Sequence, residues 1–268
     1  MNRLLARLPV VIVIVSALVL VIHGPIHQFA HYHDFADRRP LLGIPNAADV
    51  LSNLGLALVS LWALARLWPA RRDARLAAGW PGYLLFFVAL LLTAVGSGFY
   101  HWAPDNARLV WDRLPIVLAC AGLLAAVRAE TYPGSNAWTW ASMLAVAAVT
   151  SVGWWYFTDR DGMGDLRPYL FMQSLPLVLI PFWQAGGRAP RDDRLAFTLA
   201  ILLYVLAKVA ELNDHAMFAA SEWISGHTVK HLLAMAAAVV IAARLVARIR
   251  PAAGEGSIVT EIGPQPFP

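Results

Sequence analysis

Residues 81–102 read PGYLLFFVALLLTAVGSGFYHW and contain no Asp, Glu, Lys or Arg. As a helix, this stretch is long enough to cross the hydrocarbon core of a bilayer, which needs about 20 apolar residues. The rest of the chain has the same character: of its 268 residues, 59% are hydrophobic and only 14% are charged, with a mean hydropathy of +0.58. One soluble core cannot bury so much apolar surface. The sequence therefore predicts an all-α, polytopic transmembrane helix bundle.

Apolar runs of this kind, bounded by Pro, Gly or charge, recur along the chain. They lie at about residues 8–24, 48–67, 81–102, 108–127, 137–156, 168–184, 195–213 and 226–248. We expect residues 1–25 to form an uncleaved anchor helix, because no small-residue cleavage motif follows the first run. We expect a seven-helix membrane domain in residues 26–250. Residues 251–268 are rich in Pro and Gly without periodicity, which predicts a disordered cytoplasmic tail.

The net charge of +4 does not indicate nucleic-acid binding, because the arginines lie in short turns between the apolar runs. If the N-terminus is cytoplasmic, most arginines fall on the inner side of the membrane. This predicts both termini inside, a topology that suits a bacterial inner membrane. The single cysteine, Cys120, excludes an intrachain disulfide and says nothing about the redox compartment.

Polar residues inside the runs each need a reason, because an ionisable group in the membrane costs several kcal/mol unless it is paired, hydrated or bound to metal. The informative ones, in the third, fourth and eighth runs, are Ser97, His101, Asp112, His227 and His231. His227 and His231 are four residues apart, so their imidazoles share one face of a helix. Under the expected topology, three helices bring these residues together just below the outer headgroups, with Ser97 and His231 one turn deeper than their partners His101 and His227.

Three neutral histidines at one depth predict a shared metal site, with a fourth zinc position left for water as in catalytic sites. A single histidine at a helix end is more often an interfacial side chain, so it is the coincidence in depth that favours the site. Ser97 has an alternative role in helix packing, because Gly96 and Gly98 flank it. Asp112 has the alternative of an ion pair with Arg113 or Arg108.

At these residues the sequence resembles the alkaline ceramidase family, within the wider membrane-hydrolase group that also includes the adiponectin-type receptors. The resemblance spans about residues 34–235. It is carried by Asp49-Val50-Leu51-Ser52-Asn53, Gly96-Ser97 through Tyr100-His101, Asp112, His227 and His231.

The resemblance implies zinc bound by His101, His227 and His231, with Asp112 holding or deprotonating the zinc water and Ser97 assisting at the oxyanion. The implied activity is hydrolysis of the amide bond of ceramide or a similar N-acyl membrane lipid, with release of a fatty acid. These roles are physically reasonable, since a carboxylate can carry the proton and a hydroxyl can donate to a developing oxyanion.

Calcium is a further expectation of the resemblance, because eukaryotic members of the family bind it through an acidic cluster ahead of the core. The residues available here are Asp34, Asp37, Asn46 and Asp49. Arg38 and Arg39 stand where further oxygen ligands would help a hard cation, which argues against calcium. We expect instead an exposed loop that caps the second run, with Asp49 near its positive end.

Two other groups of polar residues precede or follow these motifs. A second metal site is conceivable near the outer end of the first run, although interfacial histidines are favoured there; the residues are His23, His27, His31 and His33. On the seventh run, Lys208 and Glu211 are spaced to pair, and Asp214 is expected nearer the outer surface in a supporting role.

Two other functions remain open at the level of sequence. One is a receptor or scaffold in which the metal is a structural staple, since fold analogy is a poor guide to function. The other is a b-type haem electron carrier with two axial histidines, in which Asp112 and Ser97 would have no role.

Overall fold

The computed structural model describes residues 3–132, 134–160 and 164–249. The regular structure in these residues is helical. The helices are α1 (Arg3–His23), α2 (Ala47–Ser52), α3 (Leu54–Leu67), α4 (Trp80–Trp102), α5 (Asn106–Thr131), α6 (Ala137–Arg160), α7 (Arg167–Gly186), α8 (Arg191–Leu212), α9 (Asp214–Ser221) and α10 (Gly226–Ile249). The predicted all-α helix bundle is confirmed, and the tail predicted for 251–268 lies outside the described residues.

Six helical stretches among the described residues are long and apolar enough to cross a membrane. They are Ala47–Leu67, Trp80–Trp102, Asn106–Thr131, Ala137–Arg160, Arg191–Leu212 and Gly226–Ile249. α7 is less apolar, because it includes two glutamines and two internal prolines, yet it packs in the same bundle. The chain is therefore built as a multi-pass membrane protein.

Two asparagines interrupt helical segments of the chain. The sequence pattern predicts one continuous helix at about 48–67 and the end of another at about 213. Asn53 separates α2 from α3, and its Nδ2 donates to the carbonyl of Asp49 at 2.7 Å. Asn213 separates α8 from the unexpected helix α9, and its Nδ2 donates to the carbonyl of Val209 at 2.7 Å. Such side-chain bonds compete with the backbone ladder of a helix. Both breaks lie at the same end of the bundle.

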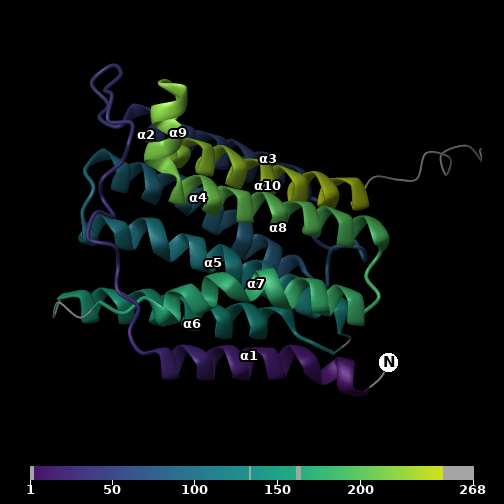
Figure 1. Cartoon of the computed structure of the whole chain (residues 1–268). Helices are drawn as coiled ribbons and strands as arrows, with labels where there is room; N and C mark the ends of the chain where they lie inside the picture. Colours follow the sequence, from purple (N-terminus) through teal and green to yellow (C-terminus); the bar gives the residue numbers. More distant parts are fainter. Residues whose placement is uncertain (1–2, 133, 161–163, 250–268) are drawn as a thin grey trace, which may run out of the picture.

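The long helices run side by side, with α1 along one edge and α3 and α10 along the opposite one (Figure 1). α5 lies between these edges, and most of its inward-facing residues are buried. The short helices α2 and α9, with the segment that joins α1 to α2, gather at one end. The N-terminus and the end of α10 lie toward the other end (Figure 1).

Facing glycines bring α4 and α5 into close contact. A Cβ atom on Gly82 would lie 2.5 Å from the carbonyl oxygen of Gly122, and one on Gly122 would lie 2.6 Å from the backbone nitrogen of Phe86. Small residues at such positions let membrane helices approach until their backbones touch. The backbones of α4 and α5 are therefore in direct contact at the level of Gly82 and Gly122.

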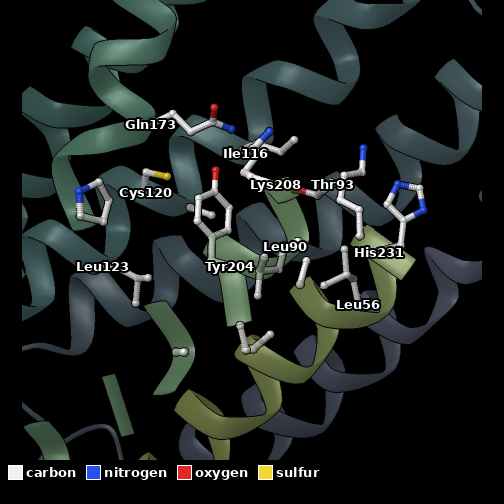
Figure 2. A pocket seen from close by; sticks show the side chains of 18 of the residues that line it. Leu56, Leu90, Thr93, Ile116, Cys120, Leu123, Gln173, Tyr204, Lys208 and His231 are labelled. Atoms are coloured by element: carbon white, nitrogen blue, oxygen red, sulfur yellow. The ribbon is translucent and has the colours of Figure 1, made fainter. Parts of the chain in front are cut away.

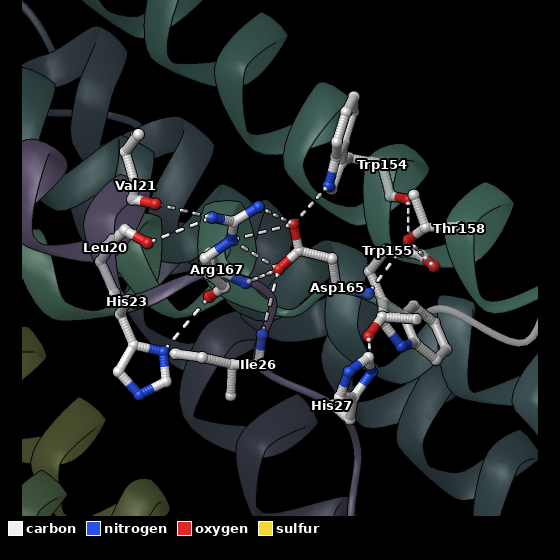
Figure 3. Close-up of polar contacts among 12 residues, drawn as sticks. Leu20, Val21, His23, Ile26, His27, Trp154, Trp155, Thr158, Asp165 and Arg167 are labelled. Carbon is white, nitrogen blue, oxygen red and sulfur yellow. Dashed lines mark hydrogen bonds and ion pairs between the residues drawn. The ribbon is translucent and has the colours of Figure 1, made fainter.

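An ion pair attaches the end of α1 to the bundle (Figure 3). Nη1 of Arg167 donates to the carbonyl of Leu20 at 3.2 Å, and Nη2 of the same residue donates to Asp165 at 2.8 Å. Burial by itself would raise the pKa of Asp165, but hydrogen bonds from Arg167 and Trp154 outweigh it and lower the pKa to about 2. The pair therefore stays charged at neutral pH, and its stabilisation is lost only as the pH falls toward that value.

We expect Gly122→Ala to lower the free energy of unfolding by about 1–3 kcal/mol, because the new Cβ would press on the backbone at Phe86. Gly98→Ala in α4 is the matched control, since a Cβ at Gly98 meets nothing within 4 Å. Thermal unfolding in detergent, followed by tryptophan fluorescence, measures both variants. Equal melting temperatures would contradict the close packing of α4 and α5.

Candidate metal centre

Three histidines from two distant helices converge at the end of the bundle where α2 and α9 lie. His101 is in the last turn of α4, and His227 and His231 are in the first two turns of α10. All three are buried, and one ligand nitrogen from each lies within 4.8 Å of the others. The expected convergence of the three imidazoles, called here the histidine triad, is therefore observed.

The separation of two of the three ligand nitrogens fits a divalent metal ion. The Nε2 atoms of His101 and His227 are 3.2 Å apart, and tetrahedral zinc with bonds of about 2.0–2.1 Å would hold two nitrogens about 3.3 Å apart. Nε2 of His231 is buried without a hydrogen-bond partner among the described residues, and a cation would satisfy it. A separation of 3.2 Å leaves no room for a porphyrin between His101 and His227.

Ser52 in α2 orients the ring of His231. Its Oγ donates to the carbonyl of Asp49 at 3.1 Å and lies 2.7 Å from Nδ1 of His231. Because the hydroxyl proton goes to Asp49, the imidazole donates its Nδ1–H to Ser52, and the lone pair of Nε2 stays free for a metal. Ser52 belongs to the motif at residues 49–53 that carries the resemblance, but the sequence does not indicate its contact with a histidine 179 residues away.

Two buried carboxylates hold the start of α10. Asp214 Oδ1 accepts from the backbone N–H of His227, and Asp49 Oδ1 accepts from the hydroxyl of Thr228, both at 2.7 Å. Negative charge is favourable there, because the first N–H groups of a helix lack partners. Asp214 thus has the supporting position expected for it. As expected, Asp49 lies in the first turn of α2 and residues 38–43 of the preceding loop are exposed, although Asp49 itself is fully buried.

The segment between α1 and α2 covers the triad. The ring of Phe35 lies 4.7 Å from that of His101 and 4.6 Å from that of His227, centroid to centroid. The N–H of Ala36 donates to Asp214 at 2.9 Å, and Nδ2 of Asn46 donates to the carbonyl of His101 at 2.8 Å. The triad is therefore closed on this side by an aromatic ring.

The acidic residues of this covering segment pair with its arginines. Asp34 pairs with Arg38, and Asp37 pairs with Arg39 at 2.7 Å. The hydrogen bond from Arg39 holds the pKa of Asp37 below its usual value. These carboxylates therefore face guanidinium groups, as the sequence order of Arg38 and Arg39 indicates.

Two of the histidines ahead of α2, His27 and His33, contact neighbouring polar groups. His33 contacts the Tyr100 hydroxyl at 2.9 Å and Oδ1 of Asn106 at 2.8 Å, and His27 contacts the carbonyl of Gly164 at 2.9 Å. Within the described part of the chain, the histidine triad is the one group of three metal-binding side chains that converges.

Ser97 and Asp112 line the same cavity as His231, a space of about 170 Å³ between the helices. Figure 2 shows His231 toward one end of this cavity and Leu123 toward the other, with Tyr204 between them. Leu123 belongs to a deeper wall that is largely apolar. From His231 to Ile241 along α10, the cavity extends about 15 Å.

The sequence left open an ion pair of Asp112 with Arg113 or Arg108. Arg108 pairs with Asp105, and the guanidinium of Arg113 lies 4.0 Å from the ring centroid of Trp155. In the part of the chain that the structure describes, Asp112 forms no ion pair with either arginine.

The close contact of α4 with α5 at this level is made by Gly96, because a Cβ atom there would overlap the carbonyl oxygen of Trp111. Gly98 has open space beside it. Ser97 lies between them and faces the cavity.

A chain of three charges joins the cavity to the triad. The predicted pair of Lys208 and Glu211 is confirmed, with Nζ and Oε2 2.8 Å apart. Lys230, to which sequence reasoning gave no role, donates to Oε1 of Glu211 at 3.1 Å, and its Nζ lies 2.7 Å from Nε2 of His227. The feature of the sequence that could have drawn attention to Lys230 is its position between the candidate metal ligands His227 and His231 in one helix.

No protein-family model, curated protein or solved structure matches the chain.

We expect the protein as purified to hold about one divalent metal ion per chain, and Ser52→Ala to weaken its binding about 10- to 100-fold, because the ring of His231 loses its orienting partner. Ser60→Ala is the matched control, since Ser60 is also buried in the same span and donates only to the carbonyl of Leu56. Metal content by mass spectrometry and titration with a competing chelator measure both. Equal affinities in the two variants would contradict the role of Ser52.

Proposed function

We propose that the protein is a zinc-dependent integral-membrane hydrolase that cleaves the amide bond of ceramide or a similar N-acyl lipid and releases a fatty acid. One observation carries this proposal: a buried histidine triad opens, through His231, onto a cavity that also holds a carboxylate and a hydroxyl and has apolar walls. The resemblance to the alkaline ceramidase family rests on the same residues and supports the same reaction.

The ligand chemistry supports zinc. Imidazole nitrogen suits zinc among the divalent metals, and three histidines with an open fourth position are typical of catalytic zinc sites. When bound, zinc supplies Lewis acidity that polarises an acyl carbonyl and activates water. Ser52, Asp49 and Asp214 hold the ligands in place before any substrate arrives.

The remaining steps belong to side chains that line the cavity. The carboxylate of Asp112 accepts a proton from the attacking water and later delivers it to the leaving nitrogen. The hydroxyl of Ser97 donates a hydrogen bond to the acyl oxygen as that oxygen gains negative charge. The apolar walls hold the acyl chain and exclude bulk water from the polar end.

The distribution of arginines supports an orientation in the membrane. In our proposal, the end of the bundle with the N-terminus and the end of α10 faces the cytoplasm, because the arginine-rich turns lie there. The histidine triad then lies near the outer face of a bacterial inner membrane, within reach of lipids of the outer leaflet.

Asp112→Asn is expected to keep the metal and to lower the rate of fatty-acid release about 10²- to 10⁴-fold, because the amide cannot carry the proton. Asp105→Asn at the start of the same helix is the control, since asparagine also caps helices well and Asp105 faces Arg108. Release of fatty acid from ceramide and other N-acyl lipids, measured with metal content, checks both variants. Bound metal without release from any such lipid would favour a receptor or scaffold.

Labelling of intact cells with a membrane-impermeant maleimide tests the orientation. In a Cys120→Ser background, we expect Trp223→Cys, which is exposed near α9, to react from outside. Arg71→Cys, in the turn after α3, is expected to react only after the cells are opened. The reverse pattern would show that the triad faces the cytoplasm.

A further inference from the structure

We propose that the lipid substrate carries an anionic group, a carboxylate or a phosphate, beside the scissile amide, and that Lys230 binds this group. The inference rests on the proposed function and selects, among the N-acyl lipids considered there, those with an anionic head group rather than the neutral ceramide. Lys230 would then be a specificity residue for the head group.

Lys230 lies beside the position where the triad would hold a metal. Its Nζ is 2.7 Å from Nε2 of His227, which in turn is 3.2 Å from Nε2 of His101. The side chain is only 14% exposed, and it lines the same cavity as Ser97 and Asp112. The ammonium is thus placed to contact a substrate whose amide is at the triad.

The ammonium has hydrogen-bonding capacity to spare. A lysine has three N–H donors and no acceptor. One donor goes to Glu211 at 3.1 Å, and another meets the lone pair of His227 Nε2. A metal on His227 would take that lone pair, and the donor would then be free for a group in the cavity.

Glu211 is not sufficient to neutralise Lys230. It also accepts from Lys208 at 2.8 Å, so two ammonium groups share one carboxylate inside an apolar helix bundle, where unbalanced charge is unfavourable. Asp112 is the second carboxylate that lines the cavity, so Glu211 and Asp112 together balance Lys208 and Lys230. A divalent ion held by the three neutral imidazoles would then make this end of the cavity positive, and an anionic group on the ligand would offset that charge.

The shape of the cavity places that anionic group next to the amide. Lys230 and His231 are at the polar end, whereas Phe197, Ile201 and Leu123 line the deeper part. An acyl chain fits the deeper part because it needs no hydrogen bonds. The head group is therefore left near Lys230, within a few bonds of the carbonyl, as in an N-acyl amino acid or an N-acyl phosphoethanolamine.

Three ligands with one acyl chain test the proposal. N-dodecanoylglycine, N-dodecanoylethanolamine and N-dodecanoylphosphoethanolamine present a carboxylate, a neutral hydroxyl and a phosphate beside the same amide. Binding to the full chain in detergent is measured by calorimetry, as purified and after a chelator has removed metal. We expect at least one anionic ligand to bind about tenfold or more tightly than the ethanolamide, and the better of the two identifies the head group.

Variants at one position separate charge from structure. Lys230→Met is expected to bind all three ligands equally, whereas Lys230→Arg keeps the preference because it keeps the positive charge. Melting temperatures verify that both variants are folded. A preference for the anionic ligand that persists in Lys230→Met would overturn the role of Lys230.

The outcomes also separate this inference from the proposed function. Equal binding of all three ligands by the unaltered chain overturns the inference and needs no variant, and release of fatty acid from any of them would still support hydrolysis. A clear preference for an anionic ligand without release from any N-acyl lipid supports the inference on binding and overturns the hydrolase proposal.

Discussion

The structure depends on one constraint, the burial of three imidazoles at one end of an apolar helix bundle. Each ring brings two nitrogens that need partners where water is scarce. Much of the polar structure at this end meets that need. Ser52 binds one ring of the histidine triad, and Asp214 and Asp49 hold the first turn of the helix that carries two of them. The ring of Phe35 covers the triad.

The cavity connects this polar cluster to an apolar interior. In the proposed reaction, this contrast determines where the scissile bond of the lipid lies. An amphiphile changes from polar to apolar at its amide or ester linkage. In the cavity the same change occurs between His231 and Leu123. A ligand that satisfied both parts would bring its linkage to the triad without a rigid head-group pocket. The charged side chains of Lys208, Glu211 and Lys230 line the same cavity.

Close packing of α4 and α5 sets the geometry of two proposed roles. Ser97 and His101 are on α4 and Asp112 is on α5, so the distance between these side chains depends on how near the two helices come. Gly96 touches the backbone at Trp111, and Gly82 and Gly122 face each other farther along. The glycines between the apolar residues therefore act on the site at a distance, through the separation of two backbones.

The sequence by itself determined the helix bundle, the extent of most of its helices and the three histidines, because hydropathy, helical spacing and expected depth are local or additive properties. Only the tertiary structure decided the partners of those residues. Ser52 meets His231 and Asp49 meets Thr228 across 179 residues, and Lys230 meets Glu211 on another helix. Spacing along the chain holds no information about such contacts, because they depend on how helices rotate and cross when they pack.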